Sequence, residues 1–188
     1  MRVCVFSDLH GNIPMLNKML DTERDVQQFI FCGDAFGYTG SYHEVVREFL
    51  KIPNLLAVQG NNDNYLISYL SRSILLDEFA KEDKELNFLK NMPEYLETTI
   101  EGKSFGIFHG GPSNHFGQRI YETTVLDERT ISKYDYLLLG HTHERLLKKV
   151  GKTMIINPGS LGSPRDESGN SYCILDLQTE RVEFKKVK

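Results

Sequence analysis

The sequence RVCVFSDLHGN, residues 2–12, holds an apolar run followed at once by an acid and an imidazole. The apolar run predicts a buried strand over Arg2–Ser7, and the glycine and asparagine at its end favour a turn. The next residues, Ile13–Arg24, have the apolar spacing of an amphipathic helix. Asp8 and His10 therefore stand at the carboxyl end of a buried strand, which is where α/β proteins bind ligands.

Two further strands follow, with a helix between them. Gln28–Cys32 and Asn54–Val58 have the length and apolar content of buried strands, and Tyr42–Lys51 has a helical pattern. The order strand–helix–strand–helix–strand is typical of a parallel sheet with crossover helices.

The second half of the chain predicts mostly antiparallel strands. Short polar turns join strand candidates into hairpins: Glu94–Ile100 with Ser104–His109, Arg145–Val150 with Thr153–Ile156, and Ser171–Leu177 with Arg181–Val187. Helices are predicted over Lys81–Asn91 and around Glu122–Ser132, and a strand with a polar end over residues 134–143. Two sheets packed face to face, with helices on the outside, accommodate all of these elements.

Length and composition limit the class of protein. The 188 residues contain no repeat or linker, so we expect one domain over residues 1–188. The net charge of −4 argues against a protein that binds nucleic acid mainly by bulk charge, although a small nucleotide held by metals is compatible with it. Cys4, Cys32 and Cys173 lie far apart in apolar stretches, which predicts buried free thiols in a reducing compartment. No signal peptide or membrane span is evident, so we expect a cytoplasmic protein with no membrane partner.

Polar side chains gather where five predicted strands end. In an extended chain residues i and i+2 point the same way, so the pair Asp8 and His10 and the pair His141 and His143 can each aim at one centre. Carboxylate oxygen together with imidazole nitrogen is the ligand set of zinc and other transition metals rather than of calcium. The full set is Asp8, His10, Asp34, Asn61, His109, His141 and His143. It is too large for one tetrahedral ion, so we expect two ions with one bridging carboxylate, where a bridging water becomes a hydroxide nucleophile near neutral pH.

Each motif alone has an ordinary structural interpretation. An acid after a strand usually caps a helix, Asn61-Asn62-Asp63 alone is a turn cluster, and a single His109 is more often a hydrogen-bonded core residue. The metal interpretation rests on all five motifs in this order. We interpret Asn157–Ser160, a Pro-Gly loop, as a tight turn between strands.

These motifs resemble those of the calcineurin-like metallophosphoesterase superfamily. Its pattern is matched here by DLH (8–10), GD (33–34), GNND (60–63), HGG (109–111) and GHTH (140–143), and the match runs from residue 1 to about residue 165. The spacing resembles that of the small bacterial and archaeal phosphodiesterases. The resemblance implies an α/β fold, a four-layer α/β/β/α sandwich of two mixed sheets flanked by helices.

The resemblance also assigns the metal ligands. It implies that one divalent ion is bound by Asp8, His10, Asp34 and His143, and the other by Asp34, Asn61, His109 and His141, with Asp34 as the bridge. Two manganese ions are the first expectation, with iron, zinc, nickel or cobalt as alternatives, because selectivity follows geometry and availability as much as ligand type.

The sequence departs from the family pattern at Asn62. Many members have a histidine here that is associated with protonation of the leaving oxygen, whereas an amide donates a hydrogen bond but no proton at neutral pH. Asn62 and Asp63 are the candidate catalytic residues, Asn62 as a donor to a phosphoryl oxygen and Asp63 by orienting a neighbouring group or capping a turn. A missing general acid matters most for poor leaving groups. We therefore predict a phosphodiesterase, or a hydrolase of activated phosphoesters, rather than a general phosphomonoesterase.

Two functions fit the sequence. The first is metal-dependent hydrolysis of a small phosphoester or nucleotide substrate. The alternative is a non-catalytic protein-interaction scaffold of the same fold, like the retromer subunit that resembles this family. The complete set of candidate ligands favours the enzyme, and a homo-oligomer is compatible with either function.

Overall fold

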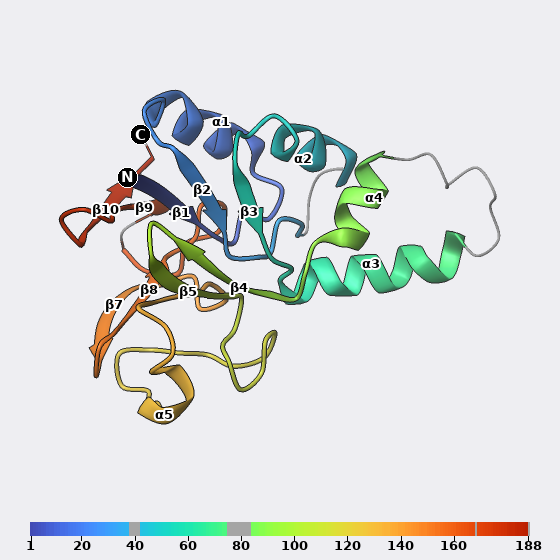
Figure 1. The fold of residues 1–188 in the computed structure, drawn as a ribbon. Helices are drawn as coiled ribbons and strands as arrows, with labels where there is room; N and C mark the ends of the chain where they lie inside the picture. The colour runs from blue at the N-terminus through green and yellow to red at the C-terminus, as the bar shows by residue number, and fades with distance from the viewer. Residues whose placement is uncertain (38–41, 75–83, 168, 188) are drawn as a thin grey trace.

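A computed structural model of the chain (Figure 1) describes residues 1–37, 42–74, 84–167 and 169–187. The first half alternates strands and helices in the order β1 (Arg2–Phe6), α1 (Ile13–Thr22), β2 (Gln28–Phe31), α2 (Tyr42–Phe49), β3 (Leu55–Ala57), α3 (Asn61–Ile74) and α4 (Lys84–Asn91). The second half is mainly strands: β4 (Tyr95–Ile100), β5 (Lys103–Phe108), α5 (Glu128–Ile131), β6 (Tyr136–Leu138), β7 (Arg145–Val150), β8 (Thr153–Pro158), β9 (Ser171–Asp176) and β10 (Arg181–Lys186).

The strands of the described residues form two mixed five-stranded sheets. In the first, with the order β10-β9-β1-β2-β3, the neighbours β1, β2 and β3 are parallel, and β9 is antiparallel to β1 and β10. In the second, with the order β4-β5-β6-β8-β7, the central strands are parallel and the edge strands antiparallel. The predicted fold class and the three hairpins are confirmed. The expectation of a mostly antiparallel second half is also confirmed, and β6 is the exception, because it pairs in parallel with β5 and with β8.

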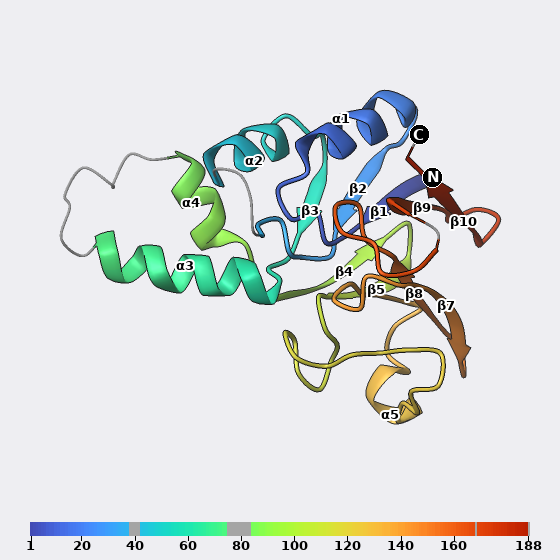
Figure 2. The same ribbon diagram turned by 180° about the vertical axis from the view of Figure 1, so that it is seen from behind.

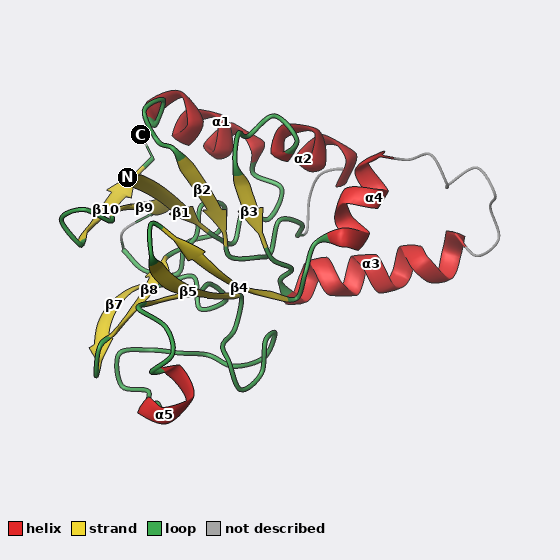
Figure 3. Ribbon diagram, viewed as in Figure 1, coloured by secondary structure: helices red, strands yellow, loops and turns green. Residues whose placement is uncertain are grey.

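Helices cover the outer faces of the two sheets, in the layer order α, β, β, α (Figures 1 and 3). Alternation along β1 shows why the core has separate layers. Val3 and Val5 pack between the sheets, whereas Cys4 and Phe6 pack under α1 and α2. A third cluster lies between the second sheet and α5. Because both faces of the first sheet are covered, its central strands are apolar throughout, and their polar residues are left to the strand ends.

Local sequence fixes where α1 begins. The side chain of Asn12 accepts a hydrogen bond from the backbone N of Met15, and Pro14 lies in the first turn, where its missing N–H costs nothing. Leu16 and Met19 then anchor the helix in the core. The short loop that carries Asp8 and His10 is thereby held between β1 and a capped helix.

Helix α3 is absent from the predicted elements, and it starts inside GNND. The backbone N of Asn62 donates to Oδ1 of Asp34 at 2.9 Å, and the backbone N of Asn64 donates to the carbonyl of Gly60 at 3.0 Å. The N–H of Asn62 at the helix start is thus satisfied by a carboxylate from another loop. In both views α3 extends away from the sheets beside α4 (Figures 1 and 2).

The helix predicted around Glu122–Ser132 is wrong over its first half, because α5 begins only at Glu128. Lys148 Nζ donates to the carbonyl oxygens of Glu122 and Thr124, which keeps this segment out of a helix. The Asp127 side chain then caps α5 by accepting from the backbone N of Arg129 at 3.0 Å. The predicted helix Lys81–Asn91 is confirmed from Lys84, and residues 81–83 lie outside the described residues.

The prediction of buried free thiols is confirmed, since Cys4, Cys32 and Cys173 are free and fully buried. Within the described part of the chain, every helix is too short or too polar to cross a bilayer.

Candidate metal centre

The seven predicted ligands come together at one rim of the two sheets. Asp8 and His10 follow β1, Asp34 follows β2, Asn61 opens α3, His109 follows β5, and His141 and His143 follow β6. Parallel strands end at the same edge, so their polar ends meet in space.

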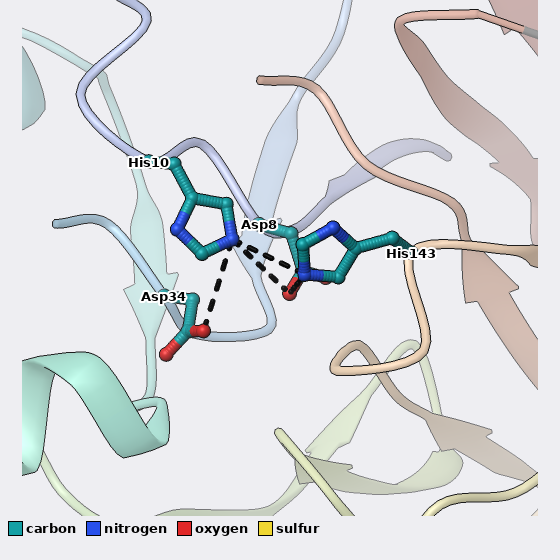
Figure 4. Close-up of side chains that lie close together, drawn as sticks. All are labelled: Asp8, His10, Asp34 and His143. Atoms are coloured by element: carbon teal, nitrogen blue, oxygen red, sulfur yellow. Dashed lines mark hydrogen bonds and ion pairs between the residues drawn. The ribbon is translucent and has the colours of Figure 1, made fainter. Parts of the chain in front are cut away.

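We define the first cluster as Asp8, His10, Asp34 and His143 (Figure 4). Its ligand atoms all lie within 4.8 Å of one another, and all of its residues are buried. Nε2 of His143 lies 3.2 Å from Nε2 of His10 and 3.2 Å from Oδ1 of Asp8. Two imidazoles and two carboxylates therefore point toward one centre. Facing imidazole nitrogens at this separation need a proton or a cation between them, and the donor set fits a divalent ion.

We define the second cluster as Asp34, Asn61, His109 and His141. Nε2 of His109 lies 3.2 Å from Oδ1 of Asn61 and 3.2 Å from Nδ1 of His141. It also lies 3.5 Å from Oδ2 of Asp34. This group, two imidazoles with a carboxylate and an amide oxygen, fits a divalent ion as well.

One oxygen atom joins the two clusters. Oδ2 of Asp34 lies 3.8 Å from Nε2 of His10 in the first cluster and 3.5 Å from Nε2 of His109 in the second. A carboxylate oxygen so placed is suited to bridge two ions about 3.5–4 Å apart.

The backbone at these positions is left-handed rather than extended. Asp8, His10, Asp34, His141 and His143 have φ angles of 51°, 47°, 61°, 68° and 62°. The backbone at both i, i+2 pairs is therefore not extended as expected. Asp8 and His10 still meet at one centre, whereas the side chains of His141 and His143 go to different clusters, so the expectation is wrong for that pair. Strained backbone of this kind gathers at functional sites and persists where surrounding contacts hold it.

Backbone carbonyls fix which imidazole nitrogen faces each cluster. His109 Nδ1 donates to the carbonyl of Cys32 at 2.9 Å, and His143 Nδ1 donates to the carbonyl of Ser163 at 2.5 Å. Because Nδ1 holds the proton for these bonds, Nε2 is the nitrogen of each ring that faces the cluster and that can bind a cation once it is deprotonated.

Asp63 holds the loop of Asp34 in place through hydrogen bonds to its backbone. It is fully buried, and its carboxylate accepts hydrogen bonds from the backbone N of Asp34 at 2.8 Å, of Gly60 at 2.8 Å and of Phe36 at 3.1 Å. The side-chain amide of Asn62 donates to Oδ2 of Asp34 at 2.7 Å. Both residues of the predicted catalytic pair thus contact the shared carboxylate or its backbone.

Two polar side chains at the end of β8 and just after it brace the loops of the site, a role that the sequence interpretation missed. Ser160 Oγ donates to the carbonyl of Asp8 at 2.7 Å, and Asn157 Nδ2 donates to the carbonyl of Gly140 at 2.6 Å. The interpretation of Asn157–Ser160 as a turn is incomplete, because the turn also braces the loops that carry Asp8 and His141. Two polar residues in an otherwise apolar strand end were the available signal.

The buried groups shift one another's pKa values. Burial opposes ionisation of Asp34, but the hydrogen bond and charge of His109 outweigh it and lower the pKa of Asp34 to about 2. Burial disfavours the charged form of His109, but Asp34 and Asp8 raise its pKa to about 9. Burial and the charges of His109 and Arg119 lower the pKa of His141 to about 4. At neutral pH, His109 therefore holds a proton that a metal ion must displace.

The affinity for Mn²⁺ is expected to rise with pH toward about 9. Proton and cation compete for Nε2 of His109, whose pKa is about 9, so lower pH favours the proton. Each pH unit should raise the apparent affinity about tenfold until His109 is deprotonated, where the curve should level. Calorimetric titration from about pH 6.5 to about pH 9.5 measures this slope. A pH-independent affinity would contradict proton competition at His109.

The comparisons with known proteins cover the same residues. A model of the calcineurin-like phosphoesterase superfamily domain matches residues 1–180. The chain is 29% identical to an uncharacterised protein of Methanocaldococcus jannaschii, over 99% of this chain and 87% of that protein. It is 28% identical to a phosphodiesterase of the same organism, over 85% of this chain and 83% of that protein. The crystal structure of a metallophosphoesterase from Sphaerobacter thermophilus has a TM-score of 0.79 and 26% identity, and the match covers 100% of this chain and 88% of that one.

Proposed function

The chain belongs to the calcineurin-like phosphoesterase superfamily, and we propose that it hydrolyses phosphodiesters with two divalent metal ions. The first cluster would hold one ion and the second cluster the other, with Asp34 shared between them. The observation that carries this proposal is the position of Asp34 Oδ2, within 4 Å of an imidazole nitrogen of each cluster. Two bound ions would supply activation of a water molecule and stabilisation of charge on the phosphoryl oxygens.

The chain's own side chains have separate tasks in this scheme. Asn62 orients both oxygens of Asp34, through its backbone N at 2.9 Å and its side-chain amide at 2.7 Å. Asp63 holds the backbone of Asp34 in place. Neither residue delivers a proton to a leaving group, because the amide of Asn62 has none to give and Asp63 is fully buried.

The lack of a proton donor at Asn62 and Asp63 supports the preference for diesters and activated phosphoesters. General acid catalysis raises a reaction rate by about 10²–10⁴-fold, and substrates with poor alkoxide leaving groups depend on it most. The relative from M. jannaschii that is named a phosphodiesterase supports the same substrate class. Manganese is the metal we propose.

A panel of substrates and metals tests the proposed function. Protein stripped by a chelator is reloaded with Mn²⁺, Fe²⁺, Co²⁺, Ni²⁺ or Zn²⁺ and given bis(p-nitrophenyl) phosphate, p-nitrophenyl phosphate and alkyl monoesters. We expect turnover of the chromogenic diester, fastest with Mn²⁺, and slow hydrolysis of alkyl monoesters. Much faster hydrolysis of alkyl monoesters than of diesters would overturn the diester preference.

Asn62→His is expected to speed hydrolysis of substrates with poor leaving groups by about tenfold or more, because imidazolium can donate a proton where the amide cannot. Bis(p-nitrophenyl) phosphate, whose leaving group needs little protonation, should change little and serves as the internal control. The measurement is kcat/KM for a series of diesters with leaving groups of increasing pKa. An unchanged slope across the series would argue against the role given to this position.

The alternative is a non-catalytic protein-interaction scaffold of the same fold. The imidazoles of His109 and His143 are held toward the clusters by backbone carbonyls, an arrangement that supports metal binding and that a scaffold does not need. Metal content measured together with turnover separates the two functions. Two tightly bound ions without turnover of any phosphoester in the panel would favour the scaffold.

A further inference from the structure

Arg119 stands at the outer side of the second cluster. It lies in the segment between β5 and α5, its side chain is exposed, and its Nε donates to Nε2 of His141 at 3.3 Å. None of the ion pairs among the described residues includes Arg119, whereas Arg129, in α5, pairs with Asp127 at 3.1 Å. A guanidinium thus contacts a candidate ligand without a carboxylate beside it.

The chain folds back to put Arg119 there. Gln118 Oε1 accepts a hydrogen bond from the backbone N of Ser113 at 3.0 Å, which closes the segment into a loop. The glycines of HGG make room for the loop: a Cβ at Gly110 would lie 2.9 Å from the Gln118 carbonyl oxygen, and one at Gly111 would lie 2.5 Å from Gln118 Oε1. The glycines that follow His109 therefore also allow the loop to place Arg119 beside the second cluster.

The contact between Arg119 and His141 does not suit a metal-loaded site. Nδ1 of His141 faces Nε2 of His109 at 3.2 Å and is the nitrogen turned toward the second cluster. When Nδ1 binds a cation, the proton of the neutral imidazole lies on Nε2. A guanidinium has donors only, so two donors would then face each other, and Arg119 would be available to another acceptor.

The geometry points to an anionic oxygen of the substrate as that acceptor. We propose that Arg119 binds a non-bridging phosphoryl oxygen of the phosphoester beside the second cluster, an inference that rests on the proposed function. A guanidinium matches phosphate oxygens in charge and geometry, and its position at the exposed side of the cluster leaves it open to an incoming ligand. Arg119 is thus a substrate-binding residue outside the set of metal ligands.

The test compares Arg119→Gln and Arg119→Lys with Arg129→Gln, a control in α5 whose arginine is ion-paired and whose side chain is 91% exposed. All proteins are loaded with Mn²⁺ and titrated calorimetrically with inorganic phosphate. For Arg119→Gln we expect phosphate binding weaker by roughly 10–100-fold, the usual effect of one charge-assisted hydrogen bond. Arg119→Lys should recover part of the affinity, and Arg129→Gln should match the parent protein.

Two further measurements separate substrate binding from a structural role. Mn²⁺ affinity should be the same in Arg119→Gln as in the parent, and the KM for bis(p-nitrophenyl) phosphate should rise by a similar factor to the phosphate dissociation constant. Phosphate affinity equal to that of the parent would overturn the inference, and so would a matching loss of Mn²⁺ affinity, which would make Arg119 a support for His141. If the parent hydrolyses no phosphoester, the proposed function fails, and the phosphate titration still decides the role of Arg119.

Discussion

Replacing Asp34 by asparagine is expected to lower kcat/KM for a phosphodiester by about 10³-fold or more, since a metal site contributes several kcal/mol to the transition state. The amide has no charge, and only one of its two terminal atoms can accept. Oδ1 and Oδ2 of Asp34 each accept a hydrogen bond from Asn62, so an NH₂ group would meet a donor on one side. We expect the variant to bind fewer than two ions per chain. Steady-state kinetics and metal content of the Mn²⁺-loaded protein measure both effects.

Asp176→Asn is the matched control for this substitution. The Asp176 carboxylate also accepts two hydrogen bonds, here both from backbone N–H groups, of Gln178 at 2.9 Å and Thr179 at 3.1 Å, in the turn between β9 and β10. The Asp176→Asn substitution should leave activity and metal content unchanged. An Asp34→Asn variant that retained two ions and more than about a tenth of the activity would show that this carboxylate does not bridge them.

Gly60→Ala is the second substitution with a large expected effect. A Cβ at Gly60 would lie 2.7 Å from Asp34 Cγ and closer still to its Oδ1 and backbone N, so Asp34, the proposed bridge, would have to move. Overpacking of this kind costs about 1–3 kcal/mol of unfolding free energy. A displacement of about 1 Å at a reacting centre can cost about 10²-fold in rate. Thermal unfolding and kcat/KM together measure the two effects.

Gly102→Ala separates displacement of Asp34 from the general effect of adding a methyl group. Gly102 lies in the turn between β4 and β5 with nothing within 4 Å of its added Cβ, although its φ of 75° strains an alanine. We expect a stability loss of about 1 kcal/mol and full activity. If Gly60→Ala behaved like Gly102→Ala, close packing against Asp34 would be irrelevant to the site.

Strong local patterns made most of the fold predictable. The apolar run of β1, the capped start of α1 and the short polar turns of the hairpins each specify an element without help from distant residues. α3 escaped prediction because its first residues, Asn61 and Asn62, favour turns when considered alone. They form a helix here because Asp34, far away in sequence, accepts hydrogen bonds at its start. The segment before α5 shows the opposite error, a predicted helix that does not form. Lys148 Nζ donates hydrogen bonds to the carbonyl oxygens of Glu122 and Thr124 instead.

The convergence of the predicted ligands followed from their places at strand ends, where a parallel sheet gathers side chains. The left-handed backbone of His141 and His143, which sends neighbouring imidazoles to different clusters, could not be predicted from an extended-strand argument. Ser160 and Asn157 act on backbone carbonyls of other loops, and Arg119 reaches His141 through a loop that folds back on itself. Contacts of this kind leave no regular spacing in the sequence.

A crystal structure of the protein soaked in Mn²⁺, with anomalous diffraction to locate the ions, tests the central claim most directly. We expect two peaks about 3.5–4 Å apart on either side of Asp34 Oδ2, one within reach of His10 and His143 and the other within reach of His109 and His141. A single peak, or two peaks that do not share Asp34, would contradict a dinuclear site.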